Sequence, residues 1–185
     1  MHRPELVELS VRDFVAAVAS ADQPVPAGGS VAALTGAASA ALLALVSEVL
    51  ERHTPGILAE PLQTARRLQR ELLQLVDQDA AAFRSFLEAP RGSDARRAAG
   101  RGVAAAPLQI GRTCVQVVDL VRRVEPQVRG AMHLDVGAAR QLAESAARSA
   151  LDIAEYNLSL AAEPTLKAEL REEISALRAT LRMKS

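Results

Sequence analysis

Small side chains dominate this sequence and limit the ways in which it can fold. Alanine occurs 37 times in 185 residues, aromatic residues make up 2%, and tryptophan is absent. A core of such residues packs densely only when its backbone elements approach closely, as helices faced with alanine and glycine can. Apolar residues recur with a helical period between proline and glycine breaks, and strand alternation is lacking. The sequence therefore predicts an all-α, up-and-down bundle of six or seven helices.

Proline, glycine and capping residues predict where the helices begin and end. Ser10 followed by Asp13 predicts a capping box that opens a short helix to about residue 20. Longer helices are expected over residues 30–52, 61–88, 94–125, 135–163 and from 164 onward. Ser30 is the expected N-cap of the first of these, and Pro107 is expected to kink or split the third.

Length, charge and cysteine content exclude several classes of protein. The chain suits a single domain over residues 1–185. Its net charge is zero, which argues against nucleic acid and membrane surfaces as partners. We expect a cytoplasmic protein, because no signal sequence is evident and the most apolar run meets Glu48 before it reaches membrane-spanning length. Cys114 is expected to be buried rather than nucleophilic, and the scattered histidines predict no metal site.

The stretch VPAGGSVAALTGAASAALLALV, residues 25–46, places two glycines before a long helix. The N–H groups at a helix N-terminus point outward, and glycines there allow a ligand or another backbone to come close. An anion or the edge of a flat polar ring could bind in this way. The simpler alternative is a loop that turns into a helix. Gly28, Gly29 and Ser30 are the candidate binding residues.

Asp79 interrupts an apolar helix face. It stands three residues after Val76 and four before Phe83, whereas Asp77 points elsewhere. An ionised carboxylate among such neighbours is costly unless it is paired, and its pKa can rise. An inward carboxylate in mid-helix has no local backbone partner, so Asp79 is either a functional group or part of a buried polar contact.

Two further polar residues share one face of the helix expected over 135–163. Asp135 opens this helix, and Asn157 lies about six turns further on at nearly the same azimuth. An aspartate in a first turn can satisfy free N–H groups, and a buried asparagine can bridge two helices. Both residues are also candidates for a site.

These residues lie in blocks that resemble a known family, the cyclodeaminase/cyclohydrolase group. It includes the C-terminal domain of formiminotransferase-cyclodeaminase and stand-alone methenyltetrahydrofolate cyclohydrolases. PAGGSVAALTGAASAALLALV resembles the glycine-rich entrance and first long helix of the family, VDQDAAAFRSF its D-x-D-A-x-A-F block, and AAAPLQIGRTC its alanine-valine-proline-leucine block. LDVGAA and the asparagine of IAEYNLSL resemble the last two blocks. The blocks follow the family order over residues 11–160.

The resemblance implies a helical bundle that forms a homodimer and acts on a tetrahydrofolate derivative. Family members close a formimino group to a methenyl bridge with loss of ammonia, or open that bridge with water, so the enzyme would be a lyase or a hydrolase without a metal or redox cofactor. Asp79 would be the acid/base group, and Asp135 a second carboxylate that orients water or balances charge. Gly28, Gly29 and Ser30 would admit the pterin or an acidic tail, and Asn157 would bind the ring.

Some positions depart from the family pattern. Ala27 replaces the first glycine, Leu134 replaces the serine before the aspartate, and the lysine-rich segment after the first long helix is absent. These departures leave an alternative open, in which a family member without catalytic activity serves as a helical binding or scaffold protein. The enzyme interpretation predicts that Asp79, Asp135 and the turn over residues 28–30 line one cleft, which a second subunit could complete. The scaffold alternative predicts that Leu134, Met132 or nearby side chains fill that cleft.

Overall fold

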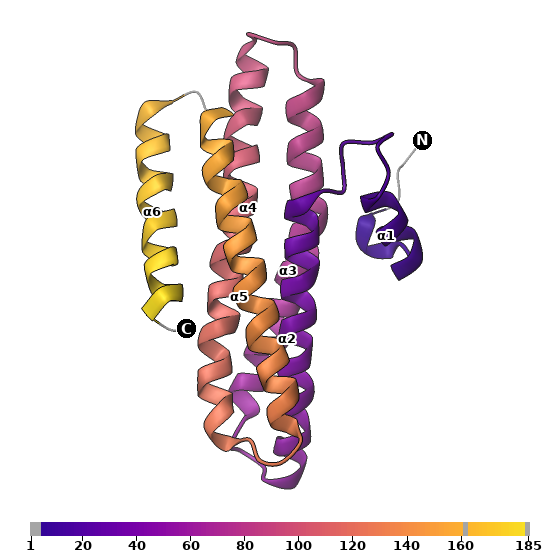
Figure 1. The fold of residues 1–185 in the computed structure, drawn as a ribbon, viewed down its shortest axis with the longest axis vertical. Helices are drawn as coiled ribbons and strands as arrows, with labels where there is room; N and C mark the ends of the chain where they lie inside the picture. Colours follow the sequence, from indigo (N-terminus) through magenta and orange to yellow (C-terminus); the bar gives the residue numbers. More distant parts are fainter. Residues whose placement is uncertain (1–4, 161–162, 184–185) are drawn as a thin grey trace.

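The computed structural model describes residues 5–160 and 163–183, and helices account for all the regular elements in these ranges. In chain order the elements are η1 (Leu6–Glu8), α1 (Val11–Val18), α2 (Gly28–His53), α3 (Ala59–Glu88), α4 (Asp94–Val124), η2 (Glu125–Gln127), α5 (Met132–Asn157), η3 (Leu158–Leu160) and α6 (Pro164–Met183). Helices α2 to α5 run up and down beside one another and enclose the core (Figure 1). Helix α6 lies outside α4 and α5, and α1 stands apart on the other side. The prediction of an all-α bundle is confirmed.

Most helix ends follow the predicted signals. The Ser10 hydroxyl accepts a hydrogen bond from the Asp13 N–H at 3.1 Å, as expected for the N-cap of α1. Ser93 caps α4 in the same way. The prediction of Ser30 as an N-cap is wrong, because α2 begins at Gly28 with Ala27 as its N-cap. Ser30 is buried in the first turn, where its hydroxyl contacts another helix instead of its own free N–H groups.

Helix α4 continues through Pro107 as one helix, so of the two expected outcomes, a kink or a split, the split does not occur. Proline lacks an N–H group, which leaves the carbonyl four residues earlier, that of Val103, without its helical partner. The side chain of Asn157 supplies that partner from α5, with Nδ2 2.9 Å from the Val103 oxygen. Helix α5 ends at this asparagine and not near residue 163, because the chain turns there into the 3₁₀ helix η3.

Helix α2 is apolar and long enough to span a membrane by length and composition. In this structure, 61% of its most apolar window is buried, and it packs mainly against α3 and α5. The apolar side chains of α2 therefore pack mainly in the core of the bundle, as expected from the sequence.

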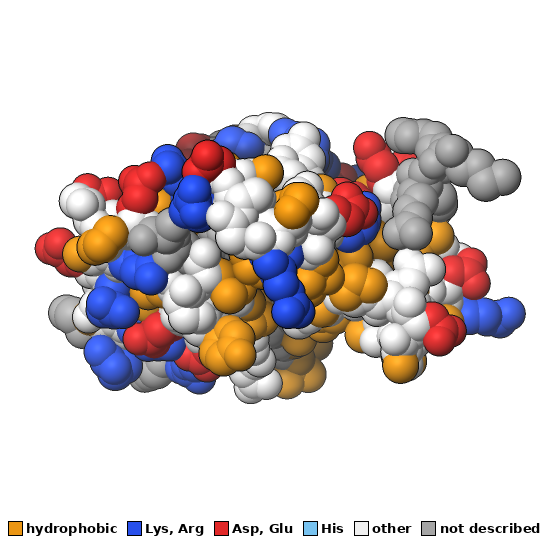
Figure 2. Space-filling view, turned by 90° about the horizontal axis from the view of Figure 1, so that it is seen from above, with side chains coloured by type: hydrophobic (Ala, Val, Ile, Leu, Met, Phe, Trp, Pro, Cys, Tyr) orange, Lys and Arg blue, Asp and Glu red, His pale blue; other side chains and the backbone are white. Residues whose placement is uncertain are grey.

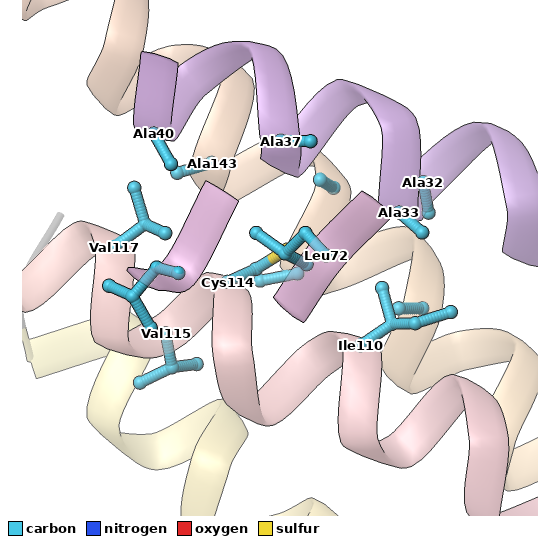
Figure 3. Close-up of a cluster of buried hydrophobic side chains, with 14 of the residues drawn as sticks. Ala32, Ala33, Ala37, Ala40, Leu72, Ile110, Cys114, Val115, Val117 and Ala143 are labelled. Carbon is cyan, nitrogen blue, oxygen red and sulfur yellow. The ribbon is translucent and has the colours of Figure 1, made fainter. Parts of the chain in front are cut away.

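The glycine and alanine residues of α2 allow the bundle to close tightly. Figure 3 shows Ala33 and Ala37 of α2 above Leu72 of α3 and Cys114 of α4. A Cβ atom on Gly36 would lie 2.5 Å from the Cys114 sulfur and 3.3 Å from Leu72 methyl carbons. The buried cysteine is a core residue, and burial raises the pKa of its thiol to about 12.

Replacing Gly36 with alanine is expected to lower the free energy of unfolding by about 1–3 kcal/mol, because the added methyl group overpacks the core. The matched control is Gly137→Ala in α5, where an added Cβ meets no atom within 4 Å. That change is expected to stabilise the protein by about 0.5–1 kcal/mol through helix propensity. Urea denaturation of both variants tests this, and equal effects at the two glycines would contradict the close contact at Gly36.

Candidate active site

A cavity of about 280 Å³ opens toward one end of the bundle, where α2 begins and α5 ends. It is lined by Val25, Ala27, Gly28, Gly29, Asp79, Phe83, Val103, Ile153, Tyr156 and Asn157. The space-filling view from above shows hydrophobic side chains gathered between the bundle and the α1 segment, with charged side chains around them (Figure 2). The described lining of the cavity is thus mostly apolar, with one carboxylate and one side-chain amide.

Asp79 is the acidic group of this cavity. It lies in the second half of α3, where the helical period turns its side chain inward between Val76 and Phe83. Burial raises the pKa of its carboxyl group above the ordinary value, and hydrogen bonding from Ser30 partly offsets this rise. No arginine, lysine or histidine is among the lining residues described. The site therefore favours a neutral carboxyl group or a cationic ligand that pairs with the ionised form.

Ser30 connects the carboxyl group to the protein interior. Its hydroxyl oxygen lies 3.1 Å from Asp79 Oδ2 and 3.1 Å from the Val76 carbonyl oxygen. A hydroxyl group has one hydrogen, so it donates to one of these acceptors at a time. When Asp79 is ionised, the hydroxyl can donate to the carboxylate. When Asp79 is protonated, the hydroxyl can accept from it and donate to Val76, so both protonation states have a hydrogen-bond partner.

Gly29 explains why the helix entrance contains glycine. A Cβ atom at this position would lie 2.2 Å from Asp79 Oδ1, which is closer than non-bonded atoms can approach. The carboxyl group therefore occupies the space that a side chain at position 29 would fill.

Gly28 is exposed at the cavity, where an added Cβ would lie 3.0 Å from the end of Ile153. Ala27 has an extended backbone, so the loss of the first family glycine causes no backbone strain.

Asn157 forms the wall opposite the glycines and has a structural partner. Its side chain is 9% exposed, and its amide N–H binds the Val103 carbonyl that Pro107 leaves free. Among the described residues, nothing donates a hydrogen bond to its amide oxygen. Asn157 therefore bridges two helices, as one of the sequence interpretations proposed, and keeps an acceptor for a ligand.

This bridge gives a double-mutant prediction. Asn157→Ala is expected to cost about 1–3 kcal/mol of unfolding free energy, because it leaves the buried Val103 carbonyl without a donor. In a Pro107→Ala background the cost should be much smaller, because the restored N–H of residue 107 can bind the same carbonyl. Chemical denaturation of the four proteins in the cycle measures the coupling, and equal costs in both backgrounds would contradict this role of Asn157.

Asp135 does not join this cavity within one chain, contrary to the expectation of a shared cleft. It lies in the first turn of α5, whereas Asn157 is the last residue of the same helix. Asn157 is 22 positions after Asp135, which corresponds to about 33 Å at a rise of about 1.5 Å per residue. Met132 and Leu134 are also at that far end, and Leu134 is 77% exposed, so neither fills the cavity as the scaffold alternative predicts.

Several lining residues were not site candidates from the sequence, among them Phe83, Ile153 and Tyr156. Phe83 and Ile153 follow the apolar period of their helices, so nothing in the sequence separates them from core residues. Tyr156 had a usable signal, since it is the single tyrosine of the chain and directly precedes Asn157.

The fold and the site together define the class of protein: an antiparallel all-α bundle with a glycine-lined, acidic cavity near one end. A family model described as formiminotransferase-cyclodeaminase matches residues 10–176. The chain therefore belongs to the formiminotransferase-cyclodeaminase family, and the resemblance seen in the sequence is confirmed.

A search of curated proteins finds no match. Among solved structures, the chain is similar to formiminotetrahydrofolate cyclodeaminase from Thermotoga maritima, with a TM-score of 0.87 and 20% sequence identity. The match covers 96% of this chain and 92% of that chain. At this identity, the likeness shows a shared fold.

Proposed function

We propose that this protein is an enzyme of folate one-carbon chemistry that acts as a formiminotetrahydrofolate cyclodeaminase or a methenyltetrahydrofolate cyclohydrolase. The observation that carries the proposal is the half-buried Asp79 carboxyl group, which faces a glycine-lined cavity in a member of this family. The similar structure from Thermotoga maritima bears the name of the first of these activities. Burial raises the pKa of this carboxyl group, and an apolar side chain at position 79 would pack in a scaffold without the cost of burying a carboxyl group.

In both reactions the reacting carbon lies between two nitrogens and carries amidinium character. In the deaminase direction, a ring-closing N–H nitrogen attacks the formimino carbon, and protonated Asp79 gives its proton to the amino group, which leaves as ammonia with the electron pair of the broken carbon–nitrogen bond. The proton lost by the attacking nitrogen returns to Asp79.

In the hydrolase direction, ionised Asp79 takes a proton from the water that attacks the methenyl carbon and passes it to the nitrogen that leaves as the carbon–nitrogen bond opens. The second water proton is released to solvent when the adduct becomes a formyl group. Burial raises the pKa of Asp79, which favours the protonated form, whereas a cationic substrate beside it favours the ionised form. Neither reaction changes an oxidation state, so we propose no redox cofactor, and we propose no metal.

The other cavity residues would bind the substrate. Gly28 and Gly29 leave room for the flat pterin beside Asp79, and Ser30 holds the carboxyl group in place. The free amide oxygen of Asn157 would accept a hydrogen bond from a ring N–H group. Asp135 would contribute only if it came from a second copy of the chain, where it could orient water or balance charge.

We propose a homodimer as the functional form. Large apolar side chains remain exposed on α2, at Val31, Leu34 and Leu45, and on the neighbouring α5, at Leu142. A second copy that covered this face would bury them and could bring Asp135 of one chain toward the cavity of the other. Sedimentation of the purified protein at micromolar concentration tests this part of the proposal, and a monomer would contradict it.

Turnover of two substrates tests the proposed activity. The wild-type protein is incubated with formiminotetrahydrofolate, and released ammonia is measured. In a parallel assay, the loss of methenyltetrahydrofolate absorbance is followed against the uncatalysed rate. We expect turnover of at least one substrate. No turnover of either substrate would contradict the proposal and favour a binding or scaffold protein.

A further inference from the structure

Aromatic residues are rare in this protein, yet they are concentrated at the cavity. The chain contains three phenylalanines, one tyrosine and no tryptophan. Two of these four rings, Phe83 and Tyr156, line the cavity that contains Asp79. A flat heterocyclic ligand binds well against aromatic rings, because stacking adds to the burial of apolar area.

The two aromatic side chains differ in their surroundings. Phe83 is half-buried and packs against the core, so the protein itself holds its ring. Tyr156 is 78% exposed although it lies in the last turn of α5 beside the buried Asn157. Among the described residues, its hydroxyl forms no hydrogen bond. One ring therefore belongs to the cavity wall, and the other stands free at its rim.

The size of the cavity shows what part of a folate it can enclose. A volume of about 280 Å³ lies just below the range of about 300–1,000 Å³ for sites that enclose drug-sized ligands. We therefore expect it to enclose the fused ring and not a complete folate with its aminobenzoyl and glutamyl parts. Since the described lining contains no arginine or lysine, it offers no cation for an acidic tail. The ring would occupy the cavity, and the remainder would extend past the rim.

We propose that Tyr156 stacks on the heterocycle of the substrate and determines how tightly the ring is bound. This inference rests on the proposed function, since it takes a reduced folate as the ligand. Stacking acts on substrate and transition state alike, so Tyr156 should influence KM and leave kcat nearly unchanged. The tyrosine hydroxyl is not required for stacking, and phenylalanine should therefore replace it.

The protein carries its own probe for this contact, because Tyr156 is its single tyrosine and tryptophan is absent. Intrinsic fluorescence thus reports on the rim of the cavity alone. We expect 5-formyltetrahydrofolate to quench this fluorescence saturably, after correction for ligand absorbance with free N-acetyltyrosinamide. The tail fragment p-aminobenzoylglutamate should not quench it at the same concentration.

Steady-state kinetics with three proteins complete the test. Tyr156→Ala is expected to raise KM about tenfold with kcat changed less than about threefold, whereas Tyr156→Phe should keep both values close to wild type. Thermal unfolding midpoints should be equal, because an exposed ring contributes little to the fold. Turnover by wild type with an unchanged KM in Tyr156→Ala would overturn this inference and leave the proposed function standing. If calorimetry detects no folate binding to wild type, the proposed function fails and this inference fails with it.

Discussion

Replacing Asp79 with asparagine is expected to reduce kcat/KM on the folate substrate by about 10²–10⁴-fold, the usual contribution of a general acid or base. Asparagine has nearly the same shape and can still accept the hydrogen bond from Ser30, so the cavity should keep its form. It cannot take up or release a proton at neutral pH. Asp77→Asn is the matched control, because Asp77 lies on the same helix but binds the backbone N–H of Leu6 outside the cavity. The control should keep activity within about threefold of wild type, and an equal loss in both variants would contradict a specific role for Asp79.

The same substitution should stabilise the protein at neutral pH. Burial raises the pKa of Asp79, so the native state binds this proton more tightly than the unfolded state does. The contribution of Asp79 to stability is therefore most favourable at low pH and is lost as pH rises from the unfolded pKa through the higher folded pKa. Asparagine does not ionise and avoids this loss. Denaturation of wild type and Asp79→Asn at several pH values should show the variant gaining relative to wild type as pH rises, and the opposite trend would contradict the raised pKa.

Replacing Gly29 with alanine is expected to have the second large effect. The new methyl group would need the space that Asp79 Oδ1 occupies, 2.2 Å from its position, so the carboxyl group must move. A displacement of about 1 Å at a reacting group can cost about 10²-fold in rate, and the crowding should cost about 1–3 kcal/mol of stability. Activity assays and urea denaturation measure the two losses.

A double variant separates crowding from other effects of Gly29→Ala. Adding Asp79→Ala removes the clashing carboxyl group and should restore most of the lost stability while activity stays absent. Gly28→Ala is the neighbouring control, since its new Cβ would meet only the flexible end of Ile153 at 3.0 Å. Gly28→Ala should therefore lose less activity and less stability than Gly29→Ala. A Gly29→Ala protein with normal activity would show that the carboxyl group need not lie against this glycine.

Local sequence signals, such as capping serines and first-turn prolines, were sufficient to predict most of the helices. Ser10, Pro61 and Pro164 each lie within the first turn or at the cap of a helix, as their side chains and backbone restrictions predict. Ser30 carries the same type of signal, but it lies inside a helix. Its hydroxyl is held by Val76 and Asp79, which are 46 and 49 residues away, and no local rule contains such contacts.

The site could be predicted only in part for the same reason. The inward position of Asp79 follows from the apolar period of α3, but the need for glycine at position 29 depends on how α2 and α3 meet. Pro107 predicts that the Val103 carbonyl lacks its helical hydrogen-bond donor. The residue that replaces this donor, Asn157, could not be predicted, because it comes from another helix. The distance of Asp135 from the cavity could have been inferred, since a helix of 26 residues separates its own ends widely.

Titration of the Asp79 carboxyl carbon tests the central claim most directly. Protein labelled with ¹³C at aspartate carboxyl groups is followed by NMR across pH, and the Asp79 signal is assigned as the one missing from Asp79→Asn. We predict a pKa above the ordinary aspartate value of about 3.9, with a further change when a folate ligand is added. A pKa at or below that value, unaffected by ligand, would show a solvated carboxyl group and contradict an acid/base role in the cavity.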